Sequence, residues 1–245
     1  MNRCFGKWDE VFHIAICRLL ILILILFLVS CSRLPVIKPV DQAALPDIMR
    51  RCHQPFVDIP YRFVHAIEVT MPGGGAGTVV GVTVIDPASE TIHSVIMTIE
   101  GFVFFDAQYE KEVSVKRAVP PFNARHFAKH MMEDVRLILL APQGRLSTAG
   151  ILEDGSTICR YDGSQGKIVD LIVHKDNSWE IGVYSDSYET IRRVNASSVK
   201  DWIPASVKLT AFDSWDYSLL LRLINAEPVS AGAIRLQPGE SPCDE

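Results

Sequence analysis

Apolar side chains recur at every second residue along much of this chain, and this alternation constrains its fold more than any other feature. Two series after residue 60 show it most clearly: Phe63, His65, Ile67 and Val69, then Val80, Val82 and Val84. Period-two alternation is typical of a strand with one buried and one exposed face. The sequence therefore predicts a mainly β protein whose first half is an antiparallel meander.

Further strands follow the same pattern on both sides of one helical segment. Residues 91–107 are long enough for two strands, with Gly101 marking a bend or bulge between them, and Val113 and Val115 continue the series. Turns rich in Asp, Asn and Ser divide the second half into further short runs. There we expect strands at residues 167–173, 179–184 and 190–194, and two more within residues 207–226.

One segment, residues 124–140, has helical periodicity instead. Its apolar side chains recur at steps of three and four residues: Ala124, Phe127, Ala128, Met131, Val135 and Ile138. Asn123 is a candidate N-cap, and Ala141 and Pro142 end the pattern. Such a stripe is broad enough to cover a sheet or a cavity. We therefore expect an α+β, mainly β fold: a curved antiparallel sheet that forms an incomplete, half-open barrel around this inserted amphipathic helix.

The first 30 residues have the pattern of an export signal. An unbroken apolar run over residues 19–29 is shorter than the roughly 20 residues that span a bilayer, and basic side chains precede it, namely Arg3, Lys7 and Arg18. The alternative is an uncleaved membrane-anchoring helix over residues 14–29, although Arg18 lies within that segment, where a charge is costly. In both cases the rest of the chain works outside the cytoplasm.

The apolar run ends in Leu28-Val29-Ser30-Cys31, which resembles the lipobox of bacterial lipoprotein signal peptides. The resemblance implies that the thiol of Cys31 carries a lipid with acyl chains such as palmitate, and that the mature chain begins there. Ser32, rather than an aspartate, follows the cysteine, which in such lipoproteins implies sorting to the outer membrane, facing the periplasm.

We expect four parts along the chain: a signal peptide at residues 1–30, a lipidated N-terminus and tether at 31–60, the half-barrel domain at 61–230, and a flexible tail at 231–245. The tether is expected because residues 32–46 hold three prolines and little periodicity. The net charge is −5, and no basic patch suggests nucleic acid as a partner.

If Cys31 is acylated, Cys52, Cys159 and Cys243 remain in the mature chain. An odd number allows at most one internal disulfide among these three residues. We expect Cys52 and Cys243 to form it, because they lie near the two ends of the mature chain. No pair has the close spacing of a metal knuckle or a redox motif.

Residues 62–107 and the closing pattern IPASVKLTAFDSWDYSLLLRLINAE resemble the LolA/LolB-like superfamily of lipoprotein carriers and receptors. The most distinctive part is residues 97–101, MTIEG, followed by FFDA at residues 104–107. The resemblance implies a lipid-anchored carrier or receptor that shields acyl chains under the helix, without catalysis or a cofactor. It also implies a protruding apolar loop, for which Met71 and residues 119–122 are the two candidates.

Affinity for an acyl chain requires only an apolar lining, because burial gains about 0.8 kcal/mol per methylene. The candidate ligand-binding residues are Ile67, Val69, Val82, Val84, Val95, Met97, Phe102, Phe104, Met131, Val135, Leu219 and Leu221. The alternative for each of them is an ordinary packed core. The alternative function is an accessory structural lipoprotein with a filled core, which acts through protein contacts in an envelope complex.

Other features of the chain suggest chemistry only weakly. His126, His130 and Glu133 have helical spacing but lack the His-Glu-x-x-His order of a zinc protease, so we interpret them as a solvated helix face and expect no metal site. A hydrolase using His126 or His130 is the weakest alternative. Residues 73–77 lack the lysine and helix of a P-loop and predict a flexible hairpin. Glu100 either has a raised pKa beside aromatic residues or faces solvent. We expect no catalytic residue.

Overall fold

The computed structural model describes residues 34–120, 122–124, 126–213 and 216–230. Cys31, the signal peptide and the tail at residues 231–245 lie outside the described residues. The N-terminal half forms β1 (Lys38–Pro39), α2 (Leu45–His53), β2 (Tyr61–Thr70), β3 (Ala76–Asp86), β4 (Thr91–Met97), β5 (Val103–Tyr109), β6 (Val113–Ala118) and α3 (Phe127–Leu139). The C-terminal half forms β7 (Arg145–Ile151), β8 (Thr157–Asp162), the 3-10 turn η1 (Ser164–Gly166), β9 (Ile168–Val173), β10 (Trp179–Tyr184), β11 (Thr190–Lys200), β12 (Ile203–Ala211) and β13 (Tyr217–Pro228).

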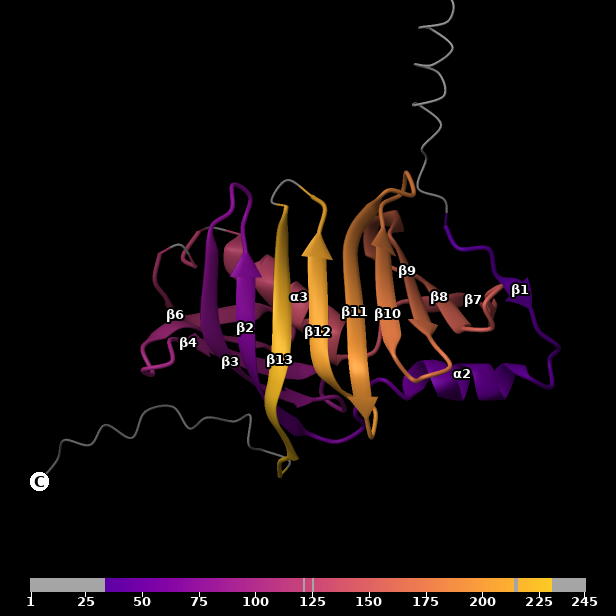
Figure 1. Ribbon diagram of the computed structural model, residues 1–245, viewed down its shortest axis with the longest axis horizontal. Helices are drawn as coiled ribbons and strands as arrows, with labels where there is room; N and C mark the ends of the chain where they lie inside the picture. The colour runs from indigo at the N-terminus through magenta and orange to yellow at the C-terminus, as the bar shows by residue number, and fades with distance from the viewer. Residues whose placement is uncertain (1–33, 121, 125, 214–215, 231–245) are drawn as a thin grey trace, which may run out of the picture. The chain divides into compact units, whose positions relative to one another are not determined.

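All these strands belong to one antiparallel sheet of 13 strands, so the expectation of a mainly β, antiparallel fold is confirmed. Its order is β1-β7-β8-β9-β10-β11-β12-β13-β2-β3-β4-β5-β6. Two meanders, β2 to β6 and β7 to β13, therefore meet where β13 pairs with β2 (Figure 1). The sheet is not closed, because β1 and β6 stand at the two ends of the order and each pairs with one neighbour.

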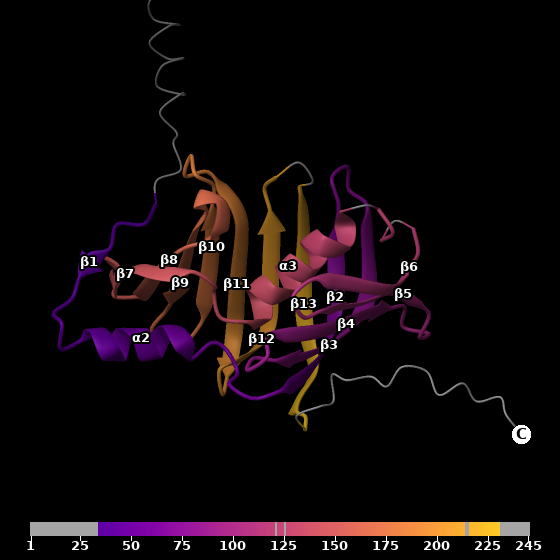
Figure 2. The ribbon, with the colours of Figure 1, turned by 180° about the vertical axis from the view of Figure 1, so that it is seen from behind.

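Helix α3 connects strands that are far apart in the sheet. It follows β6, the last strand of the order, and precedes β7, the second strand. A connection between them has to cross the sheet, and α3 does so against one face, which we call the α3 face (Figure 2). The helix begins at Phe127, three residues later than expected, and His126 rather than Asn123 occupies the N-cap position without a side-chain cap.

The alternation seen in the sequence places two apolar clusters on this face of the sheet. The first contains Trp179, Leu209 and Leu221 together with Ile138 of α3. The second contains Phe63, Ile85 and Phe105 with Met132 of α3. Because both clusters include residues of α3, the helix forms part of the core instead of lying on a completed one.

The segment before β2 differs from the tether that we expected. Lys38 and Pro39 pair with β7, and Arg160 Nη2 donates a 3.1 Å hydrogen bond to the carbonyl oxygen of Pro35. Helix α2 begins with a proline in its first turn and buries Ile48 against the first cluster. An amphipathic segment can bury its apolar side even in a proline-rich stretch, so residues 35–60 belong to the folded unit.

The disulfide also differs from our expectation. Cys52 of α2 is bonded to Cys159 of β8, not to Cys243, and both sulfur atoms lie in the first cluster. The reason is topological, because β1 and α2 lie along the end of the sheet where β7 and β8 are found. The described residues of both clusters and the disulfide fall within the compact unit Pro35–Glu245.

Candidate functional site

Six of the twelve predicted ligand-binding residues lie between α3 and the sheet. Ile67 and Val69 of β2 are paired with Leu221 and Leu219 of β13, and three of these four side chains pack in or against the first cluster. Val69 lies on the same face of β2 as Ile67, because the residue between them, Glu68, is exposed on the opposite face. Met131 and Val135 of α3 pack against the second cluster.

The other six point elsewhere. Val82 and Val84 alternate with the buried Thr83 and Ile85, and Val95 and Met97 flank the buried Ile96, so these four side chains face away from α3. Both faces of β3 and β4 carry apolar residues, and the alternation alone did not tell which face meets the helix. Phe102 lies in the turn between β4 and β5, half exposed. Ligand contact stays a prediction for all twelve residues.

Aromatic rings gather where that turn approaches the start of α3. The ring of Phe104 lies 5.4 Å from Phe102 and 5.8 Å from Phe122, between ring centroids. Phe122, in a segment that we considered for a protruding loop, is therefore packed against the sheet. The β4–β5 turn carries Ile99, 76% exposed, which the sequence analysis did not consider, and Met71, the other candidate, is 37% exposed.

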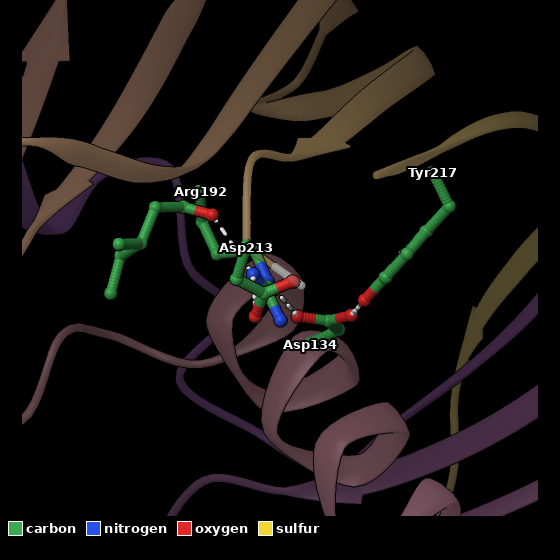
Figure 3. Close-up of polar contacts among 5 residues, drawn as sticks. Asp134, Arg192, Asp213 and Tyr217 are labelled. Atoms are coloured by element: carbon green, nitrogen blue, oxygen red, sulfur yellow. Dashed lines mark hydrogen bonds and ion pairs between the residues drawn. The ribbon is translucent and has the colours of Figure 1, made fainter. Parts of the chain in front are cut away.

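A buried polar cluster holds the middle of α3 to the sheet (Figure 3). Arg192 of β11 directs Nε to Oδ1 of Asp134 at 3.0 Å and Nη1 to Oδ2 of Asp213 at 2.7 Å. The hydroxyl of Tyr217, at the start of β13, donates to the other carboxylate oxygen of Asp134. We call these four residues the Asp134 cluster. A carboxylate next to Val135 in the apolar stripe was the sequence signal for it.

Burial sets the electrostatics of the Asp134 cluster. Desolvation raises the pKa of Asp134, and the contacts with Arg192 and Tyr217 offset part of that rise. Burial lowers the pKa of Arg192, but the neighbouring carboxylates outweigh it and the net pKa is raised. Desolvation and the Asp134 charge raise the pKa of the Tyr217 hydroxyl. The buried charge of each side chain is therefore compensated only while its partners remain in contact with it. This requirement couples the position of α3 to β11 and β13.

A small apolar cavity lies beside the C-terminal part of α3. Its volume is about 20 Å³, and it is lined by Pro55, Val57, Phe63, His65, Ile138, Leu139, Trp179, Trp202, Ile203, Pro204 and Val207. Within the described part of the chain, the buried Nε1–H of Trp179 has no hydrogen-bond acceptor. An unmet buried donor costs about 1 to 3 kcal/mol. Burial also lowers the pKa of His65 to about 4, so the imidazole is neutral at neutral pH.

A second, larger pocket adjoins the first through Val57. It has a volume of about 260 Å³ and is lined by His53, Phe56, Val57, Asp58, Pro87, Ala88, Glu90, Leu140 and Ala141. The His53, Asp58 and Glu90 side chains are more than half exposed, so the polar part of this lining forms a rim toward solvent. Sequence reasoning missed both pockets, because their walls come from segments that lie far apart in the sequence, between His53 and Val207.

The residues considered for chemistry lie apart from these pockets. His126, at the N-cap of α3, and His130, within the helix, are exposed, and Glu133 forms a 3.9 Å ion pair with Lys129. The described residues contain no group of three or more His, Cys, Asp or Glu side chains arranged to hold a metal. Glu100 is exposed and a hydrogen bond from Thr98 lowers its pKa, so the suggestion of a raised pKa was wrong.

Two further expectations concern segments rather than single side chains. The glycines at residues 73–77 belong to the β2–β3 hairpin, as predicted, and Gly73 and Gly74 have positive φ. Neither α2 nor α3 is long and apolar enough to cross a bilayer, and the described chain holds no other helix that is.

The sequence matches no known family model and no curated protein. Among solved structures, the fold matches a LolA superfamily protein from Nitrosomonas europaea at 10% identity and a TM-score of 0.49, over 76% of this chain and 94% of that one. It also matches a domain assigned to outer membrane lipoprotein sorting from Vibrio parahaemolyticus at 7% identity and a TM-score of 0.45, over 74% and 91% of the two chains. Both likenesses concern the fold alone.

Proposed function

We propose that this chain is an envelope lipoprotein that binds a lipid, or the acyl chain of a lipoprotein, between α3 and the sheet. Cys31 carries the lipid anchor and places the protein at the outer membrane, facing the periplasm. The sheet serves as a half-open barrel around the helix, and the role is that of a carrier or receptor without catalysis.

The observation that carries this proposal is the way α3 lies on the sheet. The helix covers an apolar face, yet its middle is held by the Asp134 cluster, whose buried charges replace apolar packing there. A polar cluster of this kind has one good geometry, so the helix is either seated or released. Release would expose a continuous apolar surface, on which each buried methylene of a ligand gains about 0.8 kcal/mol.

The side chains beside the cluster suit a ligand of variable shape. Met131 and Val135 are only partly buried, and Leu139 packs against both clusters. Thioether side chains adapt to irregular apolar partners because they are unbranched and polarisable. An acyl chain could therefore replace the contacts of α3 on the sheet without leaving a gap.

One observation favours a second candidate function. The cavity beside α3 has a volume of only about 20 Å³, which is too small for an acyl chain while the helix is seated. A filled core is what an accessory lipoprotein requires, and its exposed Ile99 and Phe102 would then contact a protein partner in the envelope. The two functions differ in whether α3 is ever released.

Native mass spectrometry distinguishes them. The chain is produced in a bacterial periplasm from the residue after Cys31, with Met131→Glu as the test variant and Asn123→Glu, an exposed change before the helix, as its control. Carriage predicts a co-purifying lipid that is lost in Met131→Glu and kept in Asn123→Glu. A folded wild-type protein that carries no lipid would refute carriage and leave the accessory function.

A further inference from the structure

Near its start the described chain forms a strap on the end of the sheet at β7 and β8. Residues 35–39, which we call the N-terminal strap, end in β1, and β1 pairs with β7 (Figure 1). Arg160 Nη2 donates a 3.1 Å hydrogen bond to the carbonyl oxygen of Pro35. Along β8, Arg160 follows Cys159, which belongs to the first cluster, so the guanidinium lies on the side of the sheet opposite to that cluster. We call this side the outer face.

Gly150 of β7 leaves room for the strap. A Cβ at this position would lie 2.3 Å from the carbonyl oxygen of Lys38 and 2.7 Å from Cγ2 of Ile37. Both distances are far shorter than a non-bonded contact, so any other residue would push the strap off the strand. Gly150 does not have a positive φ, so the close approach of the strap, and not the backbone conformation, requires a glycine here.

A buried ion pair completes the seat of the strap. Arg160 makes hydrogen bonds of 2.6 Å and 2.7 Å to the two carboxylate oxygens of Asp170, which is completely buried although it lies on the outer face. A charge buried in this way needs all its partners, and the same guanidinium donates to the Pro35 carbonyl. The strap is therefore held in one place by specific contacts.

The seat of the strap lies close in the chain to the proposed lipid anchor. Four residue steps separate Cys31 from Pro35, and an extended chain covers at most about 14 Å in that length. A bilayer that holds the acyl chains of Cys31 must therefore lie near the outer face at β8. A long flexible tether would let the folded unit turn freely above the membrane, whereas a tether of this length does not.

The side chains around the seat are compatible with a membrane surface. Val36 is 83% exposed, Lys38 is exposed on the strap, and Arg33 precedes the strap in the sequence. The carboxylates of Asp170 and Asp162 are each paired with an arginine. An apolar side chain beside cations suits the boundary between acyl chains and anionic headgroups. These side chains are few, so the short chain, and not the affinity of the surface, sets the orientation.

We propose that the outer face around the seat of the strap is the surface that this protein turns toward its own membrane, so that the α3 face opens away from that membrane. The partner of this surface is the lipid bilayer that holds the acyl chains of Cys31. The inference rests on the proposed lipid anchor and adds an orientation to the proposed function. A lipid or lipoprotein reaches α3 from the periplasm, and not directly from the membrane that holds the anchor.

Fluorescence quenching on the lipidated full chain in vesicles tests this orientation. In a Cys243→Ala background the mature chain has no free thiol, because Cys52 and Cys159 are bonded to each other and Cys31 carries the lipid. One introduced cysteine then takes a fluorescent dye. The vesicles contain phosphatidylglycerol and a phosphatidylcholine with a spin-labelled headgroup, which quenches only dyes close to the membrane surface.

Two exposed positions on opposite sides of the sheet carry the dye. Thr148→Cys places it on the outer face, where Thr148 pairs with Arg160 across β7 and β8. Glu133→Cys places it on the exposed side of α3. The dye at residue 148 should be quenched at least about twofold more than the dye at residue 133, because the short chain keeps the outer face near the headgroups.

Two variants free the folded unit in different ways. Gly150→Val places a side chain where Ile37 and Lys38 lie, and so displaces the strap. A Gly-Ser insertion of about ten residues before the strap leaves its seat intact but lengthens the tether. Both should remove the difference between the two dyes. Gly77→Val, in β3, is the matched control for Gly150→Val, because open space surrounds Gly77, and it should keep the difference.

Equal quenching at the two positions in the parent protein would overturn the proposed orientation. A difference that survives the insertion would also overturn it, since the short chain would then not set the orientation. The insertion changes no residue of the folded unit, so this outcome does not depend on the folding of Gly150→Val. A mature chain whose mass shows no lipid at Cys31 would overturn the proposed anchor itself, which is a separate result.

Discussion

Nε of Arg192 lies 3.0 Å from Oδ1 of Asp134, and this contact joins the middle of α3 to β11 across the interior of the protein. The two residues are 58 positions apart in the sequence, and both side chains are almost completely buried. An ion pair in this position contributes less to stability than to specificity, because desolvation consumes most of the Coulombic gain. Its effect is to define one seated position for the helix.

Asp134→Asn should therefore be strongly destabilising. The change leaves the Arg192 guanidinium buried with one carboxylate fewer, and breaking a buried pair in this way costs about 3 kcal/mol. The measurement is the free energy of unfolding from urea titration. Glu133→Gln, the exposed neighbour on the same helix, should change it by less than about 0.5 kcal/mol. A loss of under about 1 kcal/mol in Asp134→Asn would show that α3 is held by its apolar contacts instead.

His65 should make the stability of the protein depend on pH. Its pKa is about 4 in the folded state and 6.5 unfolded, so the unfolded chain binds the extra proton first as the pH falls. The stability that His65 contributes is complete above the unfolded pKa and is lost progressively as the pH falls toward the folded pKa. From about pH 7.5 to about pH 4.5, the free energy of unfolding of the wild type should fall by about 2.5 kcal/mol more than that of His65→Leu.

Urea titrations at the two pH values measure this difference, with His130→Gln, a change at an exposed imidazole, as the control that keeps the wild-type dependence. Parallel pH profiles for the wild type and His65→Leu would mean that the imidazole is solvated or paired in the folded protein. In that event the cavity beside α3 is more polar than its lining indicates.

The disulfide gives a third prediction. It closes a loop with a sequence separation of 107 residues, and by the loop-closure entropy a cross-link of this span stabilises a folded chain by about 5 kcal/mol. Replacing both Cys52 and Cys159 by alanine should lower the free energy of unfolding by about that amount, whereas Cys243→Ala should leave it unchanged. Mass spectrometry of a non-reduced digest should join the Cys52 peptide to the Cys159 peptide, and a Cys52–Cys243 peptide would contradict the structure.

The alternation of apolar residues predicted most of the sheet, because it reports directly which side chains of a strand are buried. Strands β2 to β6 and β9 to β13 lie near where the pattern placed them, with β11, β12 and β13 extending beyond the expected bounds. Strand β7 was missed because Ser147, Thr148 and Gly150 interrupt its apolar alternation, and β8 was missed because its first three residues are all buried instead of alternating. Helix α2 was missed because it is only nine residues long and has a proline in its first turn.

What the sequence does not reveal is which distant segments meet. The pairing of β13 with β2 joins the two meanders, and no local pattern indicates it. The same holds for the partners of Asp134 and for Trp179, whose position in a cavity depends on the turn before β12 and the segment after α2. Only half of the predicted ligand-binding residues lie on the α3 face. A strand with apolar residues on both faces fits the alternation in either orientation, so the pattern does not tell which face meets the helix.

The exposed β4–β5 turn should bind membrane surfaces even without the lipid anchor. Ile99 at its tip is 76% exposed, Phe102 is 50% exposed, and the Arg117 guanidinium lies 5.1 Å from the centre of the Phe102 ring. An apolar tip beside an aromatic ring and a cation suits the boundary between acyl chains and anionic headgroups. Inserting one isoleucine side chain gains about 1.5 kcal/mol or more, so Ile99→Ser should lower the affinity of Pro35–Glu245 for phosphatidylglycerol vesicles about tenfold in flotation assays. Ile224→Ser removes an equivalent side chain, 60% exposed on β13, and should leave vesicle binding unchanged. Equal losses in the two variants would assign the binding to general surface hydrophobicity, and this turn would then be free to contact a protein partner.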